Sequence, residues 1–245
     1  MKPSDQLSAR DAPWRGHDDL DPKSPSGHEY GVTVSTRLTS NFRELHRKEA
    51  MDITPQQVID CLEDAEVKNW VLMGLHGYVG YLPMPRATQD VDVMIPYSQK
   101  KRTVNAVSAR WPTLEIRELS QVIRFLDPAD RDKTGTAKPV IDIMLPWSPF
   151  QETILKSHVL IDKSTGHRLP TIEAAIVSKY AAMISPHRSF DKKEQDAVDL
   201  RRLIKANQGE YDATNIASLA ANVWEGGSEE IARFTTQALT DQRFE

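Results

Sequence analysis

Hydrophobic and polar positions change their spacing several times along the chain, and each spacing predicts an element of secondary structure. Apolar positions at helical spacing follow Thr54, a candidate N-cap, and Pro55, which suits the first helical position, so a helix is predicted over 55–66. Short apolar or alternating runs bounded by glycine or proline predict strands at 69–73, 90–95, 114–119, 121–126 and 140–145. Between them the pattern predicts helices at 75–81 and 99–111 and a polar loop at 127–138.

The C-terminal part of the chain is predicted to be helical. Helices are expected at 171–184 and 191–207, the second beginning with Asp191 and Glu194 in a pattern like a capping box. A last helix is expected within 213–240. This order of elements predicts an α+β fold, in which a mixed β-sheet core flanked by helices is followed by a mainly helical C-terminal part.

The N-terminal segment has a different composition from the rest. Residues 1 to about 40 are rich in Asp, Ser, Pro, Gly and His and carry few apolar positions, so little surface is available to offset the entropy of ordering. We therefore expect a flexible N-terminal arm over 1–45, a sheet domain over 46–150 and a helical domain over 151–245.

The overall composition is that of a soluble globular protein, with 39% hydrophobic and 27% charged residues among 245. No uninterrupted apolar run approaches the roughly 20 residues of a membrane span, and the first residues lack the apolar stretch of a secretory signal. These features predict a cytoplasmic protein with no membrane partner. The single cysteine, Cys61, lies in the apolar rhythm of a helix and is expected to pack in the core.

The net charge of -4 argues against extensive nucleic-acid binding, because proteins that grip many phosphates usually carry a basic excess. Only a local basic patch could hold a polynucleotide. The candidates are the runs at 100–102 and 201–205, although such runs are more often solvated helix faces.

Three aspartates carry the candidate chemistry. Side chains at i and i+2 of a strand share a face, so Asp90 and Asp92 are expected side by side, and Asp142 lies in the middle of another predicted strand. Like charges this close favour a hard divalent cation between them, and Mg²⁺ fits best. Three such carboxylates can hold two Mg²⁺ ions, which is the arrangement needed for nucleotidyl transfer. The alternative is that Asp90 and Asp92 lie on a solvated sheet face.

The residues upstream of this pair favour the metal site. Gly74 and the glycine at position 77 follow a predicted strand and open a helix, where backbone N–H groups can hold a phosphate. In the extended run that leads to Asp90, alternation places Arg86 and Thr88 on the same face as the two carboxylates. Four polar groups therefore converge, which suits a site better than a core.

The motif Gly-x-His-Gly followed by Pro-Arg-Ala-Thr-x-Asp-Val-Asp resembles the nucleotidyltransferase superfamily of the DNA polymerase beta-like fold, and in particular its AbiEii/AbiGii toxin-like branch. The resemblance implies that Asp90 and Asp92 bind metal, that Asp142 completes the site and that the Gly74 turn holds the triphosphate. Many members carry Gly or Ser where this chain has Leu75. A compensating hydrogen-bond donor to the phosphate is therefore expected, and His76 or Arg86 could supply it.

The resemblance extends into the helical half. Lys179 lies within an apolar stripe of its predicted helix and takes the place of a helical lysine in the family, where it would contact a phosphate of the nucleotide; the alternative is a lysine that snorkels from the edge of the stripe. Asp196 and Asp199 match an acidic element, and Asp196 is the candidate for the nucleotide cleft. A salt-bridge network with Arg188 and Lys193 is the alternative.

The resemblance implies a Mg²⁺-dependent enzyme that moves a nucleotidyl group from a nucleoside triphosphate to an acceptor, with Asp142 assisting deprotonation of that acceptor. A tRNA or other RNA, a protein or a small molecule are the acceptor classes. The chain is then expected to act as the toxin of a toxin–antitoxin pair, with an antitoxin protein as partner. Leu75 motivates a second hypothesis, a non-catalytic nucleotide-binding or toxin–antitoxin partner module of the same fold. A third, modification of an antibiotic, suits the acidic composition.

Overall fold

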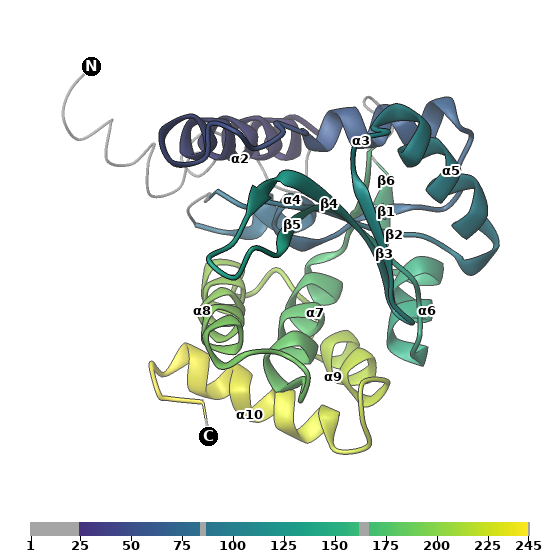
Figure 1. The fold of residues 1–245 in the computed structure, drawn as a ribbon. Helices are drawn as coiled ribbons and strands as arrows, with labels where there is room; N and C mark the ends of the chain where they lie inside the picture. The colour runs from purple at the N-terminus through teal and green to yellow at the C-terminus, as the bar shows by residue number, and fades with distance from the viewer. Residues whose placement is uncertain (1–24, 84–86, 162–166, 245) are drawn as a thin grey trace.

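A five-stranded mixed β-sheet lies between two groups of helices in the computed structural model, which describes residues 25–83, 87–161 and 167–244 (Figure 1). Strands β2 and β5 are parallel, and the other neighbours in the sheet are antiparallel. In spatial order the strands are β1 (Val71–Leu72), β2 (Val91–Met94), β5 (Ala137–Met144), β4 (Val122–Arg131) and β3 (Glu115–Glu118). This is the α+β class that the sequence predicts.

One face of the sheet packs against helices from the first half of the chain. Alternate side chains of the central strands, such as Val93 and Ile143, are fully buried there with residues of α3 and α5. These helices are α3 (Pro55–Asp64) and α5 (Lys100–Arg110), the last preceded by the 3₁₀ turn Tyr97–Gln99. Helix α2 (Pro25–His46) packs against the short helical segment 74–81. Thr54 caps α3 in a full capping box with Gln57, so the predicted start of this helix is confirmed.

The second group of helices covers the other face and forms a second apolar core. Tyr180 is fully buried in this core together with Met94 of β2, so the core crosses the predicted boundary between a sheet domain and a helical domain. The elements are α4 (Gly74–Tyr78) with the 3₁₀ turn Val79–Tyr81, α6 (Pro149–Ser157), α7 (Ile172–Ile184), α8 (Phe190–Ala206), α9 (Ala213–Ala221) and α10 (Gly227–Leu239). A separate hairpin joins β6 (Val159–Ile161) to β7 (Arg168–Pro170). No helix in the described ranges is long and apolar enough to span a membrane.

The predicted flexible arm is wrong from residue 25 onward, because α2 is a helix of 22 residues; residues 1–24 lie outside the described part of the chain. One face of α2 is buried, and most of its members are polar rather than apolar. They recur at helical spacing: His28, Val32, Ser35, Thr39 and Arg43. Specific hydrogen bonds therefore hold a helix whose composition predicts disorder.

Three smaller predictions also need correction. The polar loop predicted at 127–138 is mostly strand, since β4 continues to Arg131 and β5 begins at Ala137. Asp127 explains this continuation, because its carboxylate accepts hydrogen bonds from Met51 N and Ala129 N. The last helix is two helices, α9 and α10, and α8 begins at Phe190 after Ser189 rather than at a capping box formed by Asp191.

We expect Arg43→Ala to lower the free energy of unfolding by about 2–3 kcal/mol, because its guanidinium donates to Asp52 Oδ1 and to the carbonyl of Gln89, each at 2.7 Å. Amide hydrogen exchange in residues 87–91 should also become faster. Chemical denaturation with hydrogen-exchange mass spectrometry measures both. Arg37→Ala, at an exposed position of the same helix, should change stability by no more than about 0.5 kcal/mol. Equal effects of the two substitutions would contradict this role of Arg43.

Candidate metal and nucleotide site

The three predicted aspartates come together at the middle of the sheet. Asp92 of β2 lies directly opposite Asp142 of the parallel strand β5, and Asp90 lies just before β2 begins at Val91. One ligand oxygen from each of the three carboxylates lies within 4.8 Å of the others. The structure therefore brings together the residues that the sequence singles out, although Asp90 itself is outside the strand.

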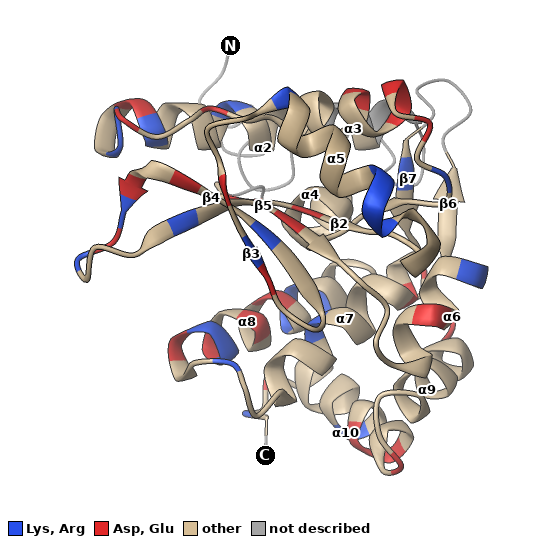
Figure 2. Ribbon diagram, turned by 45° about the vertical axis from the view of Figure 1, so that its right-hand side comes forward, with Lys and Arg blue, Asp and Glu red and all other residues tan. Residues whose placement is uncertain are grey.

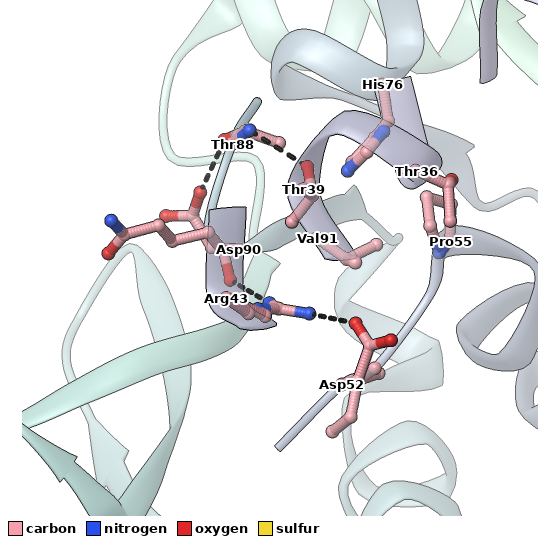
Figure 3. A pocket seen from close by; sticks show the side chains of 11 residues that line it. Thr36, Thr39, Arg43, Asp52, Pro55, His76, Thr88, Asp90 and Val91 are labelled. Atoms are coloured by element: carbon pink, nitrogen blue, oxygen red, sulfur yellow. Dashed lines mark hydrogen bonds and ion pairs between the residues drawn. The ribbon is translucent and has the colours of Figure 1, made fainter. Parts of the chain in front are cut away.

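Helix α2 holds the segment that carries Asp90. Thr88 donates from its hydroxyl to Asp90 Oδ1 at 3.1 Å, and its backbone N–H donates to Thr39 Oγ1 of α2, also at 3.1 Å. Arg43 of α2 donates to the carbonyl of Gln89 between them. Figure 3 shows Thr39 and Arg43 beside Thr88 and Asp90. Thr88, predicted as a site residue, thus positions Asp90 from one side while α2 fixes Thr88 from the other.

The electrostatics of Asp92 show how unfavourable this crowding is for bare carboxylates. Burial, followed by the negative charges of Asp90 and Asp142, raises the pKa of Asp92 well above its ordinary value. The positive charges of Lys179 and Arg188 act in the opposite direction, so both cations lie near enough to interact with the site. A cation bound among the carboxylates would relieve the same repulsion.

Asp142 is the most buried member of the group and has one oxygen available. Burial raises its pKa to about 6, against the lowering influence of Arg124, and Asp90 adds to the rise. Its Oδ2 accepts from Arg124 Nε at 3.3 Å, whereas its buried Oδ1 has no hydrogen-bond partner among the described residues. An unpaired buried carboxylate oxygen is costly, which favours a ligand at this point.

The residues present fit Mg²⁺. Carboxylate oxygens are the ligands that a hard divalent cation prefers; Asp92 and Asp142 are held by paired strands, and Asp90 is held by its hydrogen bond from Thr88. Asp90, Asp92 and Asp142 would hold the ion, and Asp142 also has an oxygen, Oδ1, without a hydrogen-bond partner among the described residues. The arrangement can therefore gather divalent cations and the phosphate oxygens that accompany them.

Gly74 lies directly against this cluster. Its φ of 58° is in the left-handed region, and a Cβ at this position would overlap the Oδ2 atom of Asp92. The preceding residue fixes the approach, since Met73 N donates to the carbonyl of Asp92 at 2.8 Å. Only glycine gives both the turn and the space beside the carboxylate, which agrees with the place predicted for Gly74.

The other residues predicted near the phosphate are placed differently. Leu75 is buried in the apolar core, so its side chain packs away from solvent and supplies no donor. His76 is buried against α2, with Nδ1 3.4 Å from Ser35 Oγ, and Figure 3 shows it beside Thr36 and Thr39. Arg86 lies outside the described residues.

Lys179 and Asp196, predicted to contact the nucleotide separately, instead meet each other in a buried ionic network. Lys179 Nζ lies 2.8 Å from Asp196 Oδ1 and 2.9 Å from Asp199 Oδ2, and it stacks over the ring of Tyr78 at 5.0 Å. Arg188 forms an ion pair with the second oxygen of Asp196. The alternative of a salt-bridge network therefore holds for Asp196 and Arg188, but Lys179 takes the place expected for Lys193 and does not snorkel, because it is buried. The network lies close to the metal site, because Lys179 influences the pKa of Asp92.

Sequence reasoning did not single out two basic residues that flank the carboxylates. Arg124 of β4 lies directly opposite Asp142 and forms an ion pair with it. Lys192 of α8 is near enough for its charge to lower the pKa of Asp142. Arg124 could have been noticed from alternation in its strand, where Ile123 and Phe125 face the core on either side of it.

We expect Gly74→Ala to displace the Asp92 carboxylate and weaken Mg²⁺ binding about 10-fold or more, while costing about 1–2 kcal/mol of stability through its positive φ. Isothermal titration with Mg²⁺ and thermal unfolding measure the two effects. Gly135→Ala is the matched control, because Gly135 also has positive φ but open space at its Cβ. It should lose similar stability and bind Mg²⁺ normally. Unchanged Mg²⁺ binding in Gly74→Ala would contradict the role of this turn.

Comparison of the sequence with protein-family models and with curated proteins finds no match. Comparison with solved structures finds nucleotidyltransferase-like proteins. An antigenic nucleotidyltransferase-like protein from Paracoccidioides brasiliensis aligns over 87% of this chain and 94% of its own, with 16% identity and a TM-score of 0.42.

Two structures of terminal uridylyl transferase 4 from Trypanosoma brucei are also similar to the chain. The one with bound GTP covers 75% of this chain and 74% of its own, at 12% identity and a TM-score of 0.27. The one with bound CTP covers 87% and 74%, at 11% identity and a TM-score of 0.33. These values assign no site residue to this chain, and the narrower resemblance to AbiEii/AbiGii toxins stays a prediction.

Proposed function

We propose that this protein is a Mg²⁺-dependent nucleotidyltransferase that uses a nucleoside triphosphate as donor. The observation that carries the proposal is the cluster of Asp90, Asp92 and Asp142, whose ligand oxygens lie within 4.8 Å of one another beside a glycine turn. Metal-bound carboxylates next to a backbone turn that accommodates phosphate are the parts that nucleotidyl transfer requires.

The donor is proposed to lie on the Gly74 side of the carboxylates. The turn approaches Asp92 so closely that no side chain separates the backbone from this carboxylate. Lys179 and Arg188, whose charges act on Asp92, supply positive potential from the helical half. Residues proposed to contribute to nucleotide binding are Gly74, His76, Arg86, Thr88, Lys179 and Asp196.

The chemistry divides between the ions and the chain. When bound, Mg²⁺ neutralises charge on the triphosphate and favours the deprotonated acceptor. Asp142 is ionised at neutral pH because its pKa is about 6, and its unpaired Oδ1 can take the proton of the acceptor hydroxyl. The acceptor oxygen then bonds to the α-phosphorus while the bond to the departing pyrophosphate breaks. Asp90 and Asp92 would hold the Mg²⁺ in place for this displacement.

A non-catalytic nucleotide-binding module is the second candidate. Two observations favour it: Leu75 supplies no hydroxyl for phosphate, and Lys179 is engaged by Asp196 and Asp199. In this case nucleotide would bind without turnover. Calorimetry that shows Mg²⁺–nucleotide binding with no transferred label from any nucleotide would support this candidate over the enzyme.

The finer assignments rest on the resemblance in residues 74–92. They are a role as the toxin of a toxin–antitoxin pair, an antitoxin protein as partner, and an RNA, a protein or a small molecule as acceptor. Each has its own readout, because the mass added to RNA or protein after incubation identifies the nucleotide and the acceptor together.

We expect the purified protein to transfer label from at least one α-labelled nucleoside triphosphate to an acceptor in cell extract when Mg²⁺ is present. Asp92→Asn should lower the rate about 100-fold or more, because the site loses a metal ligand. The matched control is Asp64→Asn, at an exposed position of α3, which should keep the parental rate. Equal rates for Asp92→Asn and the parent, or no labelled product under any condition, would refute the enzyme.

The raised pKa of Asp142 sets the direction of a pH effect. Its protonated form is favoured in the folded, metal-free protein, so this group contributes stability below pH about 4 and loses it as pH rises through about 6. Mg²⁺ needs the ionised form, so the rise in melting temperature caused by Mg²⁺ should be largest above pH 7 and fade below pH 6. Thermal unfolding with Mg²⁺ or with EDTA at several pH values measures it. A shift that is independent of pH, or retained in Asp142→Asn, would contradict the assignment.

A further inference from the structure

Four charged residues form a row across the sheet, one on each of four neighbouring strands. Asp92 of β2 lies opposite Asp142 of β5, Asp142 lies opposite Arg124 of β4, and Arg124 lies opposite Arg117 of β3. Directly opposed residues share a face of the sheet, so the two arginines lie next to the two carboxylates in one row on that face. Figure 2 shows acidic residues on β2 and β5 and basic residues on β3 and β4.

This row faces the helical half of the molecule. Met94, two residues after Asp92 on the same face, packs in the core formed with α7 and α8, whereas Val93 faces the opposite core. Lys192 of α8 faces the row as well, since its charge reaches Asp142. The arginines therefore lie on the side of the sheet that bears the metal site.

Both arginines have donors to spare. Arg124 contacts Asp142 through Nε, and its two terminal nitrogens form no hydrogen bond or ion pair within the part of the chain that the structure describes. Arg117 is exposed and forms no hydrogen bond or ion pair with any described residue. The neighbouring arginine of β4, Arg131, is instead paired with Glu115. Among the described residues, Arg117 therefore lacks an acidic partner, and Arg124 uses only its Nε, in the contact with Asp142.

The pairing of Arg117 with Arg124 is itself unfavourable. Like charges directly opposite on antiparallel strands have Cβ atoms only about 5 Å apart and destabilise the pair. An anion between the two guanidinium groups removes this repulsion and uses their planar donors, which match a phosphate in geometry. Two opposed arginines beside a metal site, of which only Arg124 has an acidic partner, therefore indicate a phosphate subsite.

The order of the strands favours a phosphate of the acceptor over a phosphate of the donor triphosphate. Across the sheet, the Gly74 turn after β1 comes first, then the carboxylates of β2 and β5, and then Arg124 and Arg117. In-line displacement places the acceptor opposite the departing pyrophosphate. If the donor triphosphate lies toward Gly74, the acceptor enters over Asp142 and continues over the arginines.

We propose that Arg124 and Arg117 bind a phosphate group of the acceptor, so that the acceptor is a phosphate-bearing molecule rather than a protein or a neutral metabolite. This inference rests on the proposed function and names its acceptor class. The phosphate belongs either to the end of a polynucleotide or to a phosphorylated small molecule. A local subsite of two arginines also agrees with the net charge of -4, which argues against a long basic track.

The test uses a short, 5′-labelled single-stranded RNA with a free 3′ hydroxyl as the probe, in Mg²⁺ without nucleotide. Fluorescence anisotropy at several salt concentrations gives its affinity. Arg117→Gln should weaken RNA binding about 3- to 10-fold and lower the salt slope by about 0.7, which corresponds to one lost phosphate contact on a single strand. Binding of each Mg²⁺–nucleoside triphosphate, measured by calorimetry, should not change.

Arg110→Gln is the matched control, because it removes the same charge from an exposed position at the end of α5, which covers the other face of the sheet. It should bind RNA as the parent does. Uridine 5′-monophosphate and uridine as competitors separate the two sources. If the monophosphate displaces the labelled RNA from the parent but not from Arg117→Gln, the phosphate belongs to a small acceptor. If only the affinity for RNA depends on Arg117, the phosphate belongs to a polynucleotide.

Several outcomes would overturn the inference. The first is that the parent binds neither RNA nor the monophosphate. The second is that Arg117→Gln and Arg110→Gln lose RNA affinity equally. The third is that Arg117→Gln loses nucleoside triphosphate binding while its RNA binding is unchanged. The last result would place the arginines on the donor and leave nucleotidyl transfer intact. RNA binding through Arg117 in a protein that neither binds nor transfers a nucleotide would refute the proposed function and retain the phosphate subsite.

Discussion

Mutual repulsion among Asp90, Asp92 and Asp142 is the constraint on which the rest of the site depends. Strand pairing fixes the backbone of Asp92 opposite that of Asp142, so these two side chains project side by side from one face of the parallel pair β2–β5. Burial and repulsion raise the pKa of both groups, which means that the fold holds them where isolated carboxylates would not stay. The stability of the sheet offsets the cost of repulsion and burial, and a bound cation would reduce that cost.

Helix α2 holds Asp90, the carboxylate outside the strand, close to the other two despite the repulsion. Its contacts with the segment before β2 are polar and specific, through Thr39 and Arg43. Such contacts depend on geometry more than on buried apolar area. The flexible arm predicted from composition over 1–45 therefore includes most of α2, because a stripe of hydroxyl, imidazole and guanidinium groups has no apolar periodicity to recognise.

Sequence predicted the convergence of the carboxylates for a simple reason: side chains alternate along a strand, and a charged residue between two core residues must find a partner. It did not predict that Arg124 lies beside Asp142. That contact depends on which strands pair and in what register, and alternation within one strand carries no information on either. The same limit applies to the row that ends at Arg117.

The buried network around Lys179 explains how the helical half can act on the sheet. Asp196 and Asp199 of α8 meet this cation of α7 in surroundings where removing one partner leaves an uncompensated charge, so the two helices are held in one relative position. Arg188, paired with Asp196, lies near enough to Asp92 to influence its pKa. The network therefore keeps the cationic groups of Lys179 and Arg188 near Asp92 and the metal site.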